Sequence, residues 1–245
     1  MRNFLDTVDS IPDGMGFDHF DLLHWGWIVF FVVVTVANAV WYCRLSARGK
    51  DRWKKTLALL IVGNEIFKMV CLFAGGQYSF GYLPLHLCSI NIFLIAFHAW
   101  KPSGIIGGFL YTVCIPGALA ALLFPTWTSL PFGNFMHMHS FTVHIMLAMY
   151  PIVLTVAGEL RPTAKQLHKY LLLLVAMAIP VYLINLLLDT NFMFLMSADE
   201  GNPLYLFEQL WGNHLLGFPV IITGVLVVMF VPLELYRYFR SKKEK

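Results

Sequence analysis

Charged residues are scarce in this chain, and their scarcity excludes an ordinary soluble domain. Asp, Glu, Lys and Arg make up 13% of the 245 residues, against about a quarter in typical soluble proteins. Hydrophobic residues account for 58%, and the mean hydropathy is +0.69. Such a chain cannot cover a folded surface with polar groups. We therefore expect an all-α, polytopic membrane protein.

The sequence also lacks paired cysteines, a leader and repeats. Its 4 cysteines show no CxxC or CxxxC spacing, so we expect neither a zinc ribbon nor a disulfide framework. Residues 1–23 are acidic and carry no basic region followed by an apolar core, so they do not resemble a cleavable signal peptide. The absence of an evident repeat disfavours transporters built from duplicated halves.

Long apolar runs are what the sequence has instead. Each is near the ~20 residues that a helix needs to cross a bilayer, and the connections between them are short. They cover residues 24–43, 56–75, 82–100, 105–124, 140–160, 170–188 and 215–235. We predict one domain over residues 1–245, a polytopic membrane bundle of seven transmembrane helices.

The basic residues fall into alternate connections, and this distribution predicts the orientation of the bundle. The connections after the first, third and fifth spans are basic, and residues 237–245 form a basic tail. Residues 1–23 and the intervening loops are acidic or uncharged. We expect residues 1–23 outside the cytoplasm and the tail inside it. The net charge of +3 then reflects topology, and no nucleic-acid partner is expected.

Prolines, glycines and tryptophans have positions that predict kinks, close contacts and a membrane interface. Four prolines lie inside spans, where each removes a backbone hydrogen bond: Pro116, Pro151, Pro180 and Pro219. Three small residues should bring the fourth span close to a neighbour: Gly104, Gly107 and Gly108. Five aromatic residues near span ends should form an interfacial belt: Trp25, Trp27, Trp41, Trp100 and Trp127.

Polar residues inside spans are costly in hydrocarbon, so they are the candidates for function. They are Asn64, Glu65, Lys68, His86, Cys88, Asn91, His98, His144, Asn185 and Asp189. At about 1.5 Å per residue, four spans place such side chains roughly 5 to 10 Å below the outer boundary. We therefore predict a polar cavity in the outer-leaflet half of the bundle, which contains Glu65, Lys68 and His86, with His24 at its edge.

Cys88 is the candidate nucleophile within this layer. Asn91 shares its helix face, whereas His86 should point about 160° away. His144 is at a similar depth on another span and is the better general base, because a thiol needs a neighbouring imidazole to become a thiolate in apolar surroundings. Two structural alternatives remain: Cys88 can be a small apolar side chain, and Glu65 and Lys68 can neutralise each other.

Two other functions fit overlapping sets of residues. A zinc-dependent lipid hydrolase would need donors from His86, His137, His139, His144 and Glu65. His139 and His144 are five residues apart, off the i, i+4 face of helical zinc motifs, so we expect no metal and no cofactor. A transporter or lipid-binding protein would use Glu65, Lys68 and Asp189 and would form no covalent intermediate.

Three segments carry a resemblance to a known family. They are LPLHLCSI at residues 83–90, the stretch from His144 to Thr163, and NFMFLM at residues 191–196. They resemble the YwaF-like integral membrane proteins of bacteria, which are similar to the animal transmembrane-protein-164 family. The resemblance extends over most of the chain, and PLHLCS is its most specific part. It implies a multi-pass protein of a bacterial cell membrane.

The resemblance also implies an activity. The animal family is associated with acyl transfer to lysophospholipids, and Cys88 and His144 match its cysteine and histidine. More distantly, seven-helix hydrolases of fatty-acid esters of hydroxy fatty acids use a threonine and a histidine in similar places. The expected partners are therefore phospholipid and lysophospholipid, with transfer or hydrolysis of an acyl chain. Asn91, with Asn64 or Asn185, is expected to donate hydrogen bonds to the oxyanion.

Overall fold

The computed structural model describes residues 3–198 and 203–243, and its elements in these ranges are helices. The all-α prediction is confirmed for them. Two predicted features lie outside the described residues: the acidic pair Asp199 and Glu200, and the last two residues of the basic tail. The tail is helical as far as Lys243.

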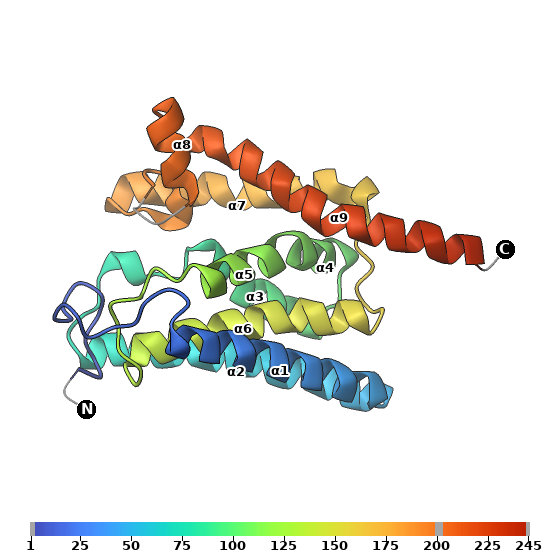
Figure 1. Cartoon of the computed structure of the whole chain (residues 1–245), viewed down its shortest axis with the longest axis horizontal. Coiled ribbons are helices and arrows are strands. Elements are labelled where there is room, and N and C mark those ends of the chain that lie inside the picture. Colours follow the sequence, from blue (N-terminus) through green and yellow to red (C-terminus); the bar gives the residue numbers. More distant parts are fainter. Residues whose placement is uncertain (1–2, 199–202, 244–245) are drawn as a thin grey trace.

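The helices run back and forth along one axis, so the two chain ends lie at opposite ends of the bundle (Figure 1). The longer ones are α1 (Leu22–Arg44), α2 (Ala47–Ala74), α3 (Leu87–Trp100), α6 (Phe135–Val156), α7 (Leu167–Leu188) and α9 (Gly217–Lys243). A further rod is continuous from α4 (Gly104–Phe109) through a π-helical segment (Leu110–Cys114) to α5 (Ile115–Leu123). A short α8 (Pro203–Trp211) precedes α9, and 3-10 turns cover Phe80–Tyr82, Ala164–Gln166, Phe192–Phe194 and His214–Leu216.

Within residues 3–198 and 203–243, six helical stretches are long and apolar enough to cross a membrane. The extent predicted for the third span, residues 82–100, is wrong, because α3 begins at Leu87 and has 14 residues. That length is about 21 Å, short of the ~30 Å hydrocarbon core. Pro84 explains the late start, since a proline disfavours helical geometry in the residue before it, and Leu83 is extended with ψ 145°. The seven-span count and the orientation remain predictions.

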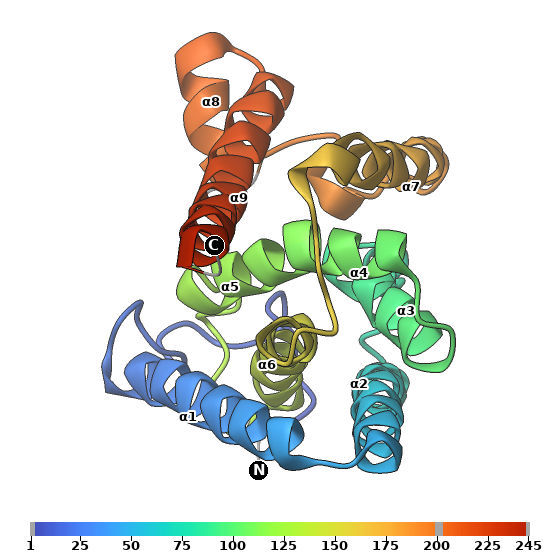
Figure 2. The same ribbon diagram turned by 90° about the vertical axis from the view of Figure 1, so that its right-hand side faces the viewer.

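Helix α6 lies among α1, α2, α3 and α5, which it contacts (Figure 2). In its most apolar stretch 67% of the residues are buried, against 11% in α7 and α9. Asn134 caps α6 by accepting hydrogen bonds from the backbone N–H groups of Met136 and His137. Its side-chain amide also donates to the carbonyls of Asn3 and Asp6 at 2.9 and 2.8 Å, which ties the N-terminal segment to the start of the central helix.

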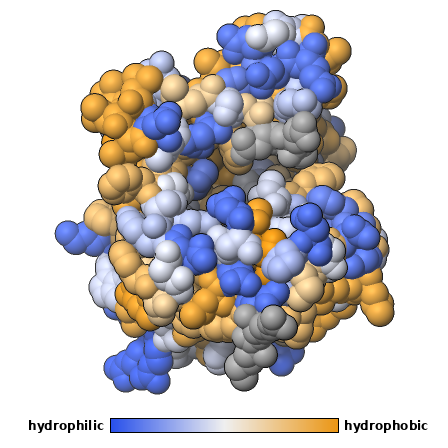
Figure 3. All heavy atoms as spheres, turned by 90° about the vertical axis from the view of Figure 1, so that its left-hand side faces the viewer, coloured by the Kyte–Doolittle hydropathy of each residue, from blue (hydrophilic) through white to orange (hydrophobic). Residues whose placement is uncertain are grey.

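We call the end of the bundle that carries the aspartate-rich N-terminal segment the acidic end. Hydrophilic side chains gather over the middle of this face, and apolar ones border it on both sides (Figure 3). At the opposite, basic end, Glu159 accepts a hydrogen bond from Tyr42 at 2.9 Å and pairs with Lys54 at 3.1 Å and Lys50 at 3.5 Å. Burial raises the pKa of the Glu159 carboxyl, but these hydrogen bonds and charges outweigh it and hold the pKa below its usual value.

The four predicted prolines occupy different positions in their helices, and only some of them are interior. Pro151 and Pro180 lie inside α6 and α7, as predicted. Pro116 lies in the first turn of α5, directly after the π-helical segment, where its missing N–H interrupts the regular ladder. Pro219 is the third residue of α9, not an interior residue, so its predicted kink is wrong, because a first turn has no bond to lose.

Two of the three glycines at the start of the fourth span pack as predicted. A Cβ on Gly107 would lie 2.5 Å from a side-chain carbon of Leu160, and one on Gly108 would lie 2.1 Å from the Tyr170 ring. Gly104 has no neighbour within 4 Å of such an atom, so its predicted packing role is wrong. Close packing of α4 on α7 therefore depends on Gly108, and its packing on the connection after α6 depends on Gly107.

Replacing Gly108 with alanine is expected to destabilise the bundle. The new methyl group overlaps a buried tyrosine ring, and overpacking of this kind costs about 1–3 kcal/mol. Thermal unfolding of the purified protein in detergent should show a midpoint several degrees below that of the parent. Gly104→Ala is the matched control and should unfold near the parent temperature. Equal midpoints for the two variants would contradict the packing role of Gly108.

Candidate functional site

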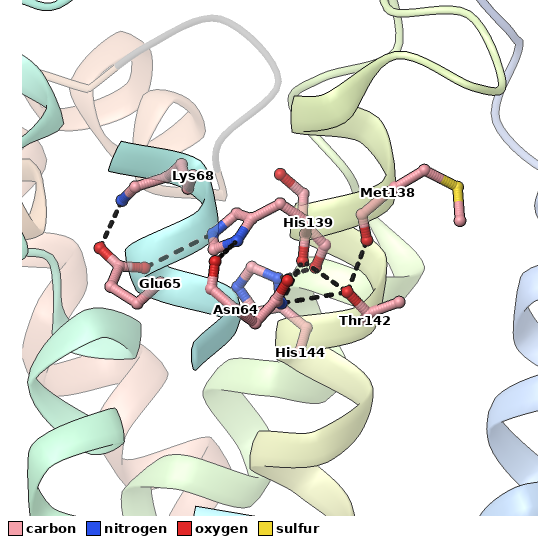
Figure 4. A network of polar contacts seen from close by, with 8 residues as sticks. Asn64, Glu65, Lys68, Met138, His139, Thr142 and His144 are labelled. Carbon is pink, nitrogen blue, oxygen red and sulfur yellow. Dashed lines mark hydrogen bonds and ion pairs between the residues drawn. The ribbon is translucent and has the colours of Figure 1, made fainter. Parts of the chain in front are cut away.

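A cluster of polar side chains joins α2 to α6 inside the bundle (Figure 4). We call it the polar layer; it comprises Asn64, Glu65, Lys68, His139, Thr142 and His144. Lys68 Nζ lies 2.5 Å from Glu65 Oε1, one helical turn away, and both side chains are buried. The other carboxylate oxygen lies 3.5 Å from His139 Nε2. The predicted meeting of Glu65 and Lys68 is confirmed, and His139 joins them.

Asn64 connects the two helices directly. Its amide nitrogen donates to the carbonyl of His139 at 3.3 Å and to Thr142 Oγ1 at 3.1 Å. Its backbone carbonyl accepts from His139 Nδ1 at 3.1 Å. Both side-chain N–H groups of Asn64 are therefore used within the protein, and the predicted role of Asn64 as an oxyanion donor is unsupported by this geometry.

His144 is held by one nitrogen and leaves the other without a partner. Nδ1 lies 2.6 Å from the carbonyl of Ser140, one turn earlier in α6. A carbonyl only accepts, so Nδ1 carries the hydrogen and Nε2 carries the lone pair in the neutral ring. Within residues 3–198 and 203–243, no group hydrogen-bonds to Nε2, and the side chain is only partly buried. The imidazole is thus set up to accept a proton at Nε2.

Cys88 is the second residue of α3, so its thiol lies in the first turn of that helix. His86, the residue at the N-cap position, makes no side-chain capping bond, and the first turn keeps backbone N–H groups without a cap. Cys88 packs against the buried cluster that contains Cys114 and Leu147. Cys114 in turn donates from Sγ to the carbonyl of Leu147 on α6 at 3.4 Å. Cys88 therefore packs on a buried cluster that includes Leu147 of α6, the helix that carries His144.

Asn91 lies one turn after Cys88 on α3 and is 2% exposed. Its Oδ1 atom is buried and has no hydrogen-bond partner among the described residues. Buried polar atoms are almost always paired, so such an atom needs an explanation, and a bound polar ligand is one. An amide oxygen only accepts, so Oδ1 suits a donor group of a ligand, and the predicted oxyanion role of Asn91 would fall to its amide nitrogen.

His86 precedes the first residue of α3 and lies at a pocket, so its predicted place on a helix face is wrong, and its direction relative to Cys88 stays a prediction. Its Nδ1 accepts from the backbone N–H of Met193 at 3.4 Å, and its ring contacts Phe192 edge-on at 5.2 Å. The pocket measures about 520 Å³ and is open at the acidic end. Its lining consists of Ser79, Phe80, Gly81, His86, Leu188, Asp189, Thr190, Asn191, Phe192 and Phe194.

Asn185 holds the loop that borders this pocket. Its side chain donates to the Phe192 carbonyl at 3.0 Å, and its Oδ1 accepts from the Phe192 N–H at 2.8 Å and from Thr190 at 3.0 Å. These bonds hold a loop in which Met193 and Phe194 have left-handed backbone angles, φ 60° and 55°. Asn185 is therefore occupied with its loop, and its predicted part in an oxyanion site is unsupported.

His24 does not face the cavity, so its predicted position there is wrong. The ring is fully buried, Nδ1 accepts from the Phe20 N–H at 2.8 Å, and Nε2 donates to the Leu122 carbonyl at 2.7 Å. His137 is similarly occupied by Trp27 and the Leu130 carbonyl, each at 3.0 Å. In the described ranges, no group of three or more His, Cys, Asp or Glu residues is placed to hold a metal ion.

Comparison with known proteins places this geometry in a family. A family model described as the TMEM164 family matches residues 18–230. The chain belongs to the TMEM164 family. The matched range includes Cys88, the polar layer and the residues of the pocket. No curated protein and no solved structure shows a significant match to this TMEM164 family member.

Trp127 lies beside the site, and its predicted location in the interfacial belt is wrong. It was expected in an interfacial belt, but it is 9% exposed and stacks on His144, with ring centroids 5.4 Å apart and planes 8° from parallel. His139, which the sequence suggested only as a candidate zinc donor, is a buried residue of α6. Position near a span end could not distinguish an inward-facing aromatic ring from one that faces lipid.

Removing one member of the Glu65–Lys68 pair should destabilise the bundle strongly. Glu65→Gln leaves a buried ammonium without its carboxylate, which costs about 3–5 kcal/mol in soluble proteins. We expect a clearly lowered unfolding temperature in detergent, and a partial recovery in the double variant with Lys68→Met. Asp51→Asn breaks the exposed i, i+4 pair with Lys55 and is the control, with little expected change. A Glu65→Gln variant as stable as Asp51→Asn would contradict the prediction.

Proposed function

We propose that this TMEM164 family member is a membrane acyltransferase that carries a fatty acyl group of a phospholipid as a thioester on Cys88. His144 serves as general base and then as general acid. The observation that supports this most is the combination, on contacting helices α3 and α6, of a thiol in an uncapped first helical turn and an imidazole with a free Nε2. The family membership supports it independently.

The helix start offsets part of the cost of forming a thiolate at Cys88 in apolar surroundings. The first turn of an α-helix carries partial positive charge from its unpaired N–H groups, and this stabilises a nearby anion. The same N–H groups can donate to an oxyanion, with Asn91 one turn further along the helix. A thiol buried in the middle of a helix would lack both effects. The late start of α3 at Leu87 is therefore the feature that gives Cys88 reactive surroundings.

Cys88 and His144 together account for every proton transferred in the two halves of the reaction. The Cys88 thiol gives its proton to His144 Nε2, and sulfur attacks the acyl carbonyl carbon of a phospholipid. The ester C–O bond breaks, and the leaving lysophospholipid oxygen takes the proton from His144. A second lysophospholipid hydroxyl then gives its proton to His144 and attacks the thioester. The C–S bond breaks, and the thiol recovers the proton. Water in place of the second hydroxyl gives hydrolysis.

The pocket at the acidic end supplies a place for a lipid headgroup. It borders His86, two residues before Cys88, and it combines aromatic rings with the Asp189 carboxylate and polar side chains. Pockets that bind amphipathic ligands combine a largely apolar lining with a few polar groups in this way. A headgroup held there would place the adjoining ester near the start of α3.

Purified protein supplied with a labelled diacyl phospholipid and an unlabelled lysophospholipid should move label between them. Cys88→Ala and His144→Ala should each lose the activity by at least about a hundredfold, because nucleophile and base act in one step. Cys43→Ala and His168→Ala remove an exposed thiol and an exposed imidazole and should retain it. Intact-mass analysis of the parent during turnover should detect an acyl adduct that Cys88→Ala lacks. Unchanged turnover in both site variants would reject the mechanism.

The buried charges of the polar layer favour one rival, a transporter without covalent chemistry. Glu65, Lys68 and His139 form an ionisable cluster inside the bundle, as many permeation sites do. Thiol labelling distinguishes the two functions. Under the acyltransferase proposal, Cys88 reacts with a small alkylating reagent at neutral pH faster in the parent than in His144→Ala. An inert Cys88, together with loss of solute uptake in Glu65→Gln, would favour transport.

A further inference from the structure

We propose that Trp127 is a positioning residue for the acyl transfer: its indole holds the His144 ring in place and stabilises the imidazolium that forms when His144 takes the proton of the thiol. The inference rests on the proposed function. It concerns a residue of the connection between α5 and α6, outside the helices that carry the reacting groups.

The two rings lie in a stacked arrangement. Their centroids are 5.4 Å apart and their planes are 8° from parallel. On α6, Phe141 contacts the indole edge-on at 5.3 Å and 81°, so the indole is itself held in place. Trp127 also belongs to the buried cluster formed with Leu122, Phe135 and Ile145. The indole is therefore a fixed surface against which the imidazole lies.

The identity of the residue points to more than packing. The Nε1 atom of Trp127 is buried and has no hydrogen-bond partner among the described residues. A buried donor without a partner costs free energy, and phenylalanine could fill much of the same space without that cost. What tryptophan adds is the strongest π face for a cation of the aromatic side chains. A neutral imidazole gains little from that face, whereas an imidazolium gains a cation–π interaction.

The Trp127 indole and the Nδ1 hydrogen bond together fix the orientation of the His144 ring. The bond from Nδ1 to the Ser140 carbonyl fixes which nitrogen carries the hydrogen, but a single bond leaves the ring free to tilt. A parallel indole removes that freedom, so Nε2 keeps one direction. Nε2 takes up and releases a proton twice within one catalytic cycle, so the positive charge on the ring is transient, and the indole faces the ring throughout. Stabilisation of that transient charge lowers the barrier.

Other titratable groups surround α6 and bear on any pH dependence. Glu65 and Lys68 on α2 neutralise each other, and the thiols Cys88 and Cys114 belong to α3 and the π-helical segment. His24 on α1 uses both ring nitrogens, at Phe20 and Leu122. His139, on α6 itself, lies within electrostatic range of His144. Variants of Trp127 leave all of these groups unchanged.

An NMR measurement tests the stack without reference to activity. The protein has 9 histidines, and ring-labelled histidine gives one signal for each, with His144→Gln identifying the signal of interest. We expect that signal to be shifted upfield by the indole ring current in the parent and less so in Trp127→Phe. In Trp127→Leu the upfield shift should be lost. Trp25→Leu removes a half-exposed tryptophan of α1 and should leave the signal in place. An unmoved His144 signal in Trp127→Leu would overturn the proposal.

Kinetics test the role in the reaction. Trp127→Leu should lower kcat about tenfold, and the acid limb of the pH–rate profile should move to lower pH, because the imidazolium loses its stabilising face. Trp127→Phe keeps a weaker face and loses no hydrogen bond, so it should recover part of both changes. If Trp127→Leu keeps the parental kcat and acid limb while Cys88→Ala is inactive, the inference fails and the proposed mechanism stands. If Cys88→Ala stays active, the mechanism fails, and the NMR result still reports on the stack.

Discussion

The structure depends on the buried polar contact between α2 and α6. In a bilayer, apolar helix faces gain little by leaving lipid for each other, so hydrogen bonds and close packing set how helices align. Asn64 supplies this alignment through three hydrogen bonds to residues 139–142 of α6. Sliding the helices by one turn would break all of them and would separate Glu65 from His139. The position of His144 along the bundle is thus set by contacts of His139 and Thr142, less than two turns earlier in α6.

A second constraint is the shortness of α3. A helix of 14 residues does not span the hydrocarbon core, so the predicted third span needs the additional length of residues 80–86, of which Phe80–Tyr82 form a single 3-10 turn. Irregular backbone inside a membrane is tolerated where it lines a cavity, because its polar groups then have water, ligand or protein partners. The pocket beside His86 lies where this segment meets the loop held by Asn185. A break in one helix therefore accounts for both the pocket and the placement of Cys88 at a helix start.

The sequence was sufficient for features that depend on composition along one helix. Hydropathy located six long helices, and the i, i+3 spacing predicted the contact of Glu65 with Lys68. The sequence was insufficient where the partners of a side chain lie on other helices or loops. His24 and Asn185 are polar residues inside spans like His144, yet backbone groups of other segments already bond to their side chains. Burial of Trp127 depends on how the connection between α5 and α6 folds back, which no periodicity encodes. The helix start at Leu87 could have been found from Pro84, whose effect on the preceding residue is local.

The neutrality of the polar layer bears on how a histidine can work there as a base. A lone carboxylate near His144 would hold a proton on the imidazole and leave no lone pair for the thiol. Lys68 pairs with one oxygen of Glu65, and His139 lies beside the other oxygen. The positive charge of Lys68 therefore compensates the carboxylate charge within the polar layer. Two uncharged groups contact the His144 ring, the Ser140 carbonyl and the Trp127 indole. A neutral imidazole is therefore compatible with this site, and a π face stabilises the cation without preventing its return to the neutral form.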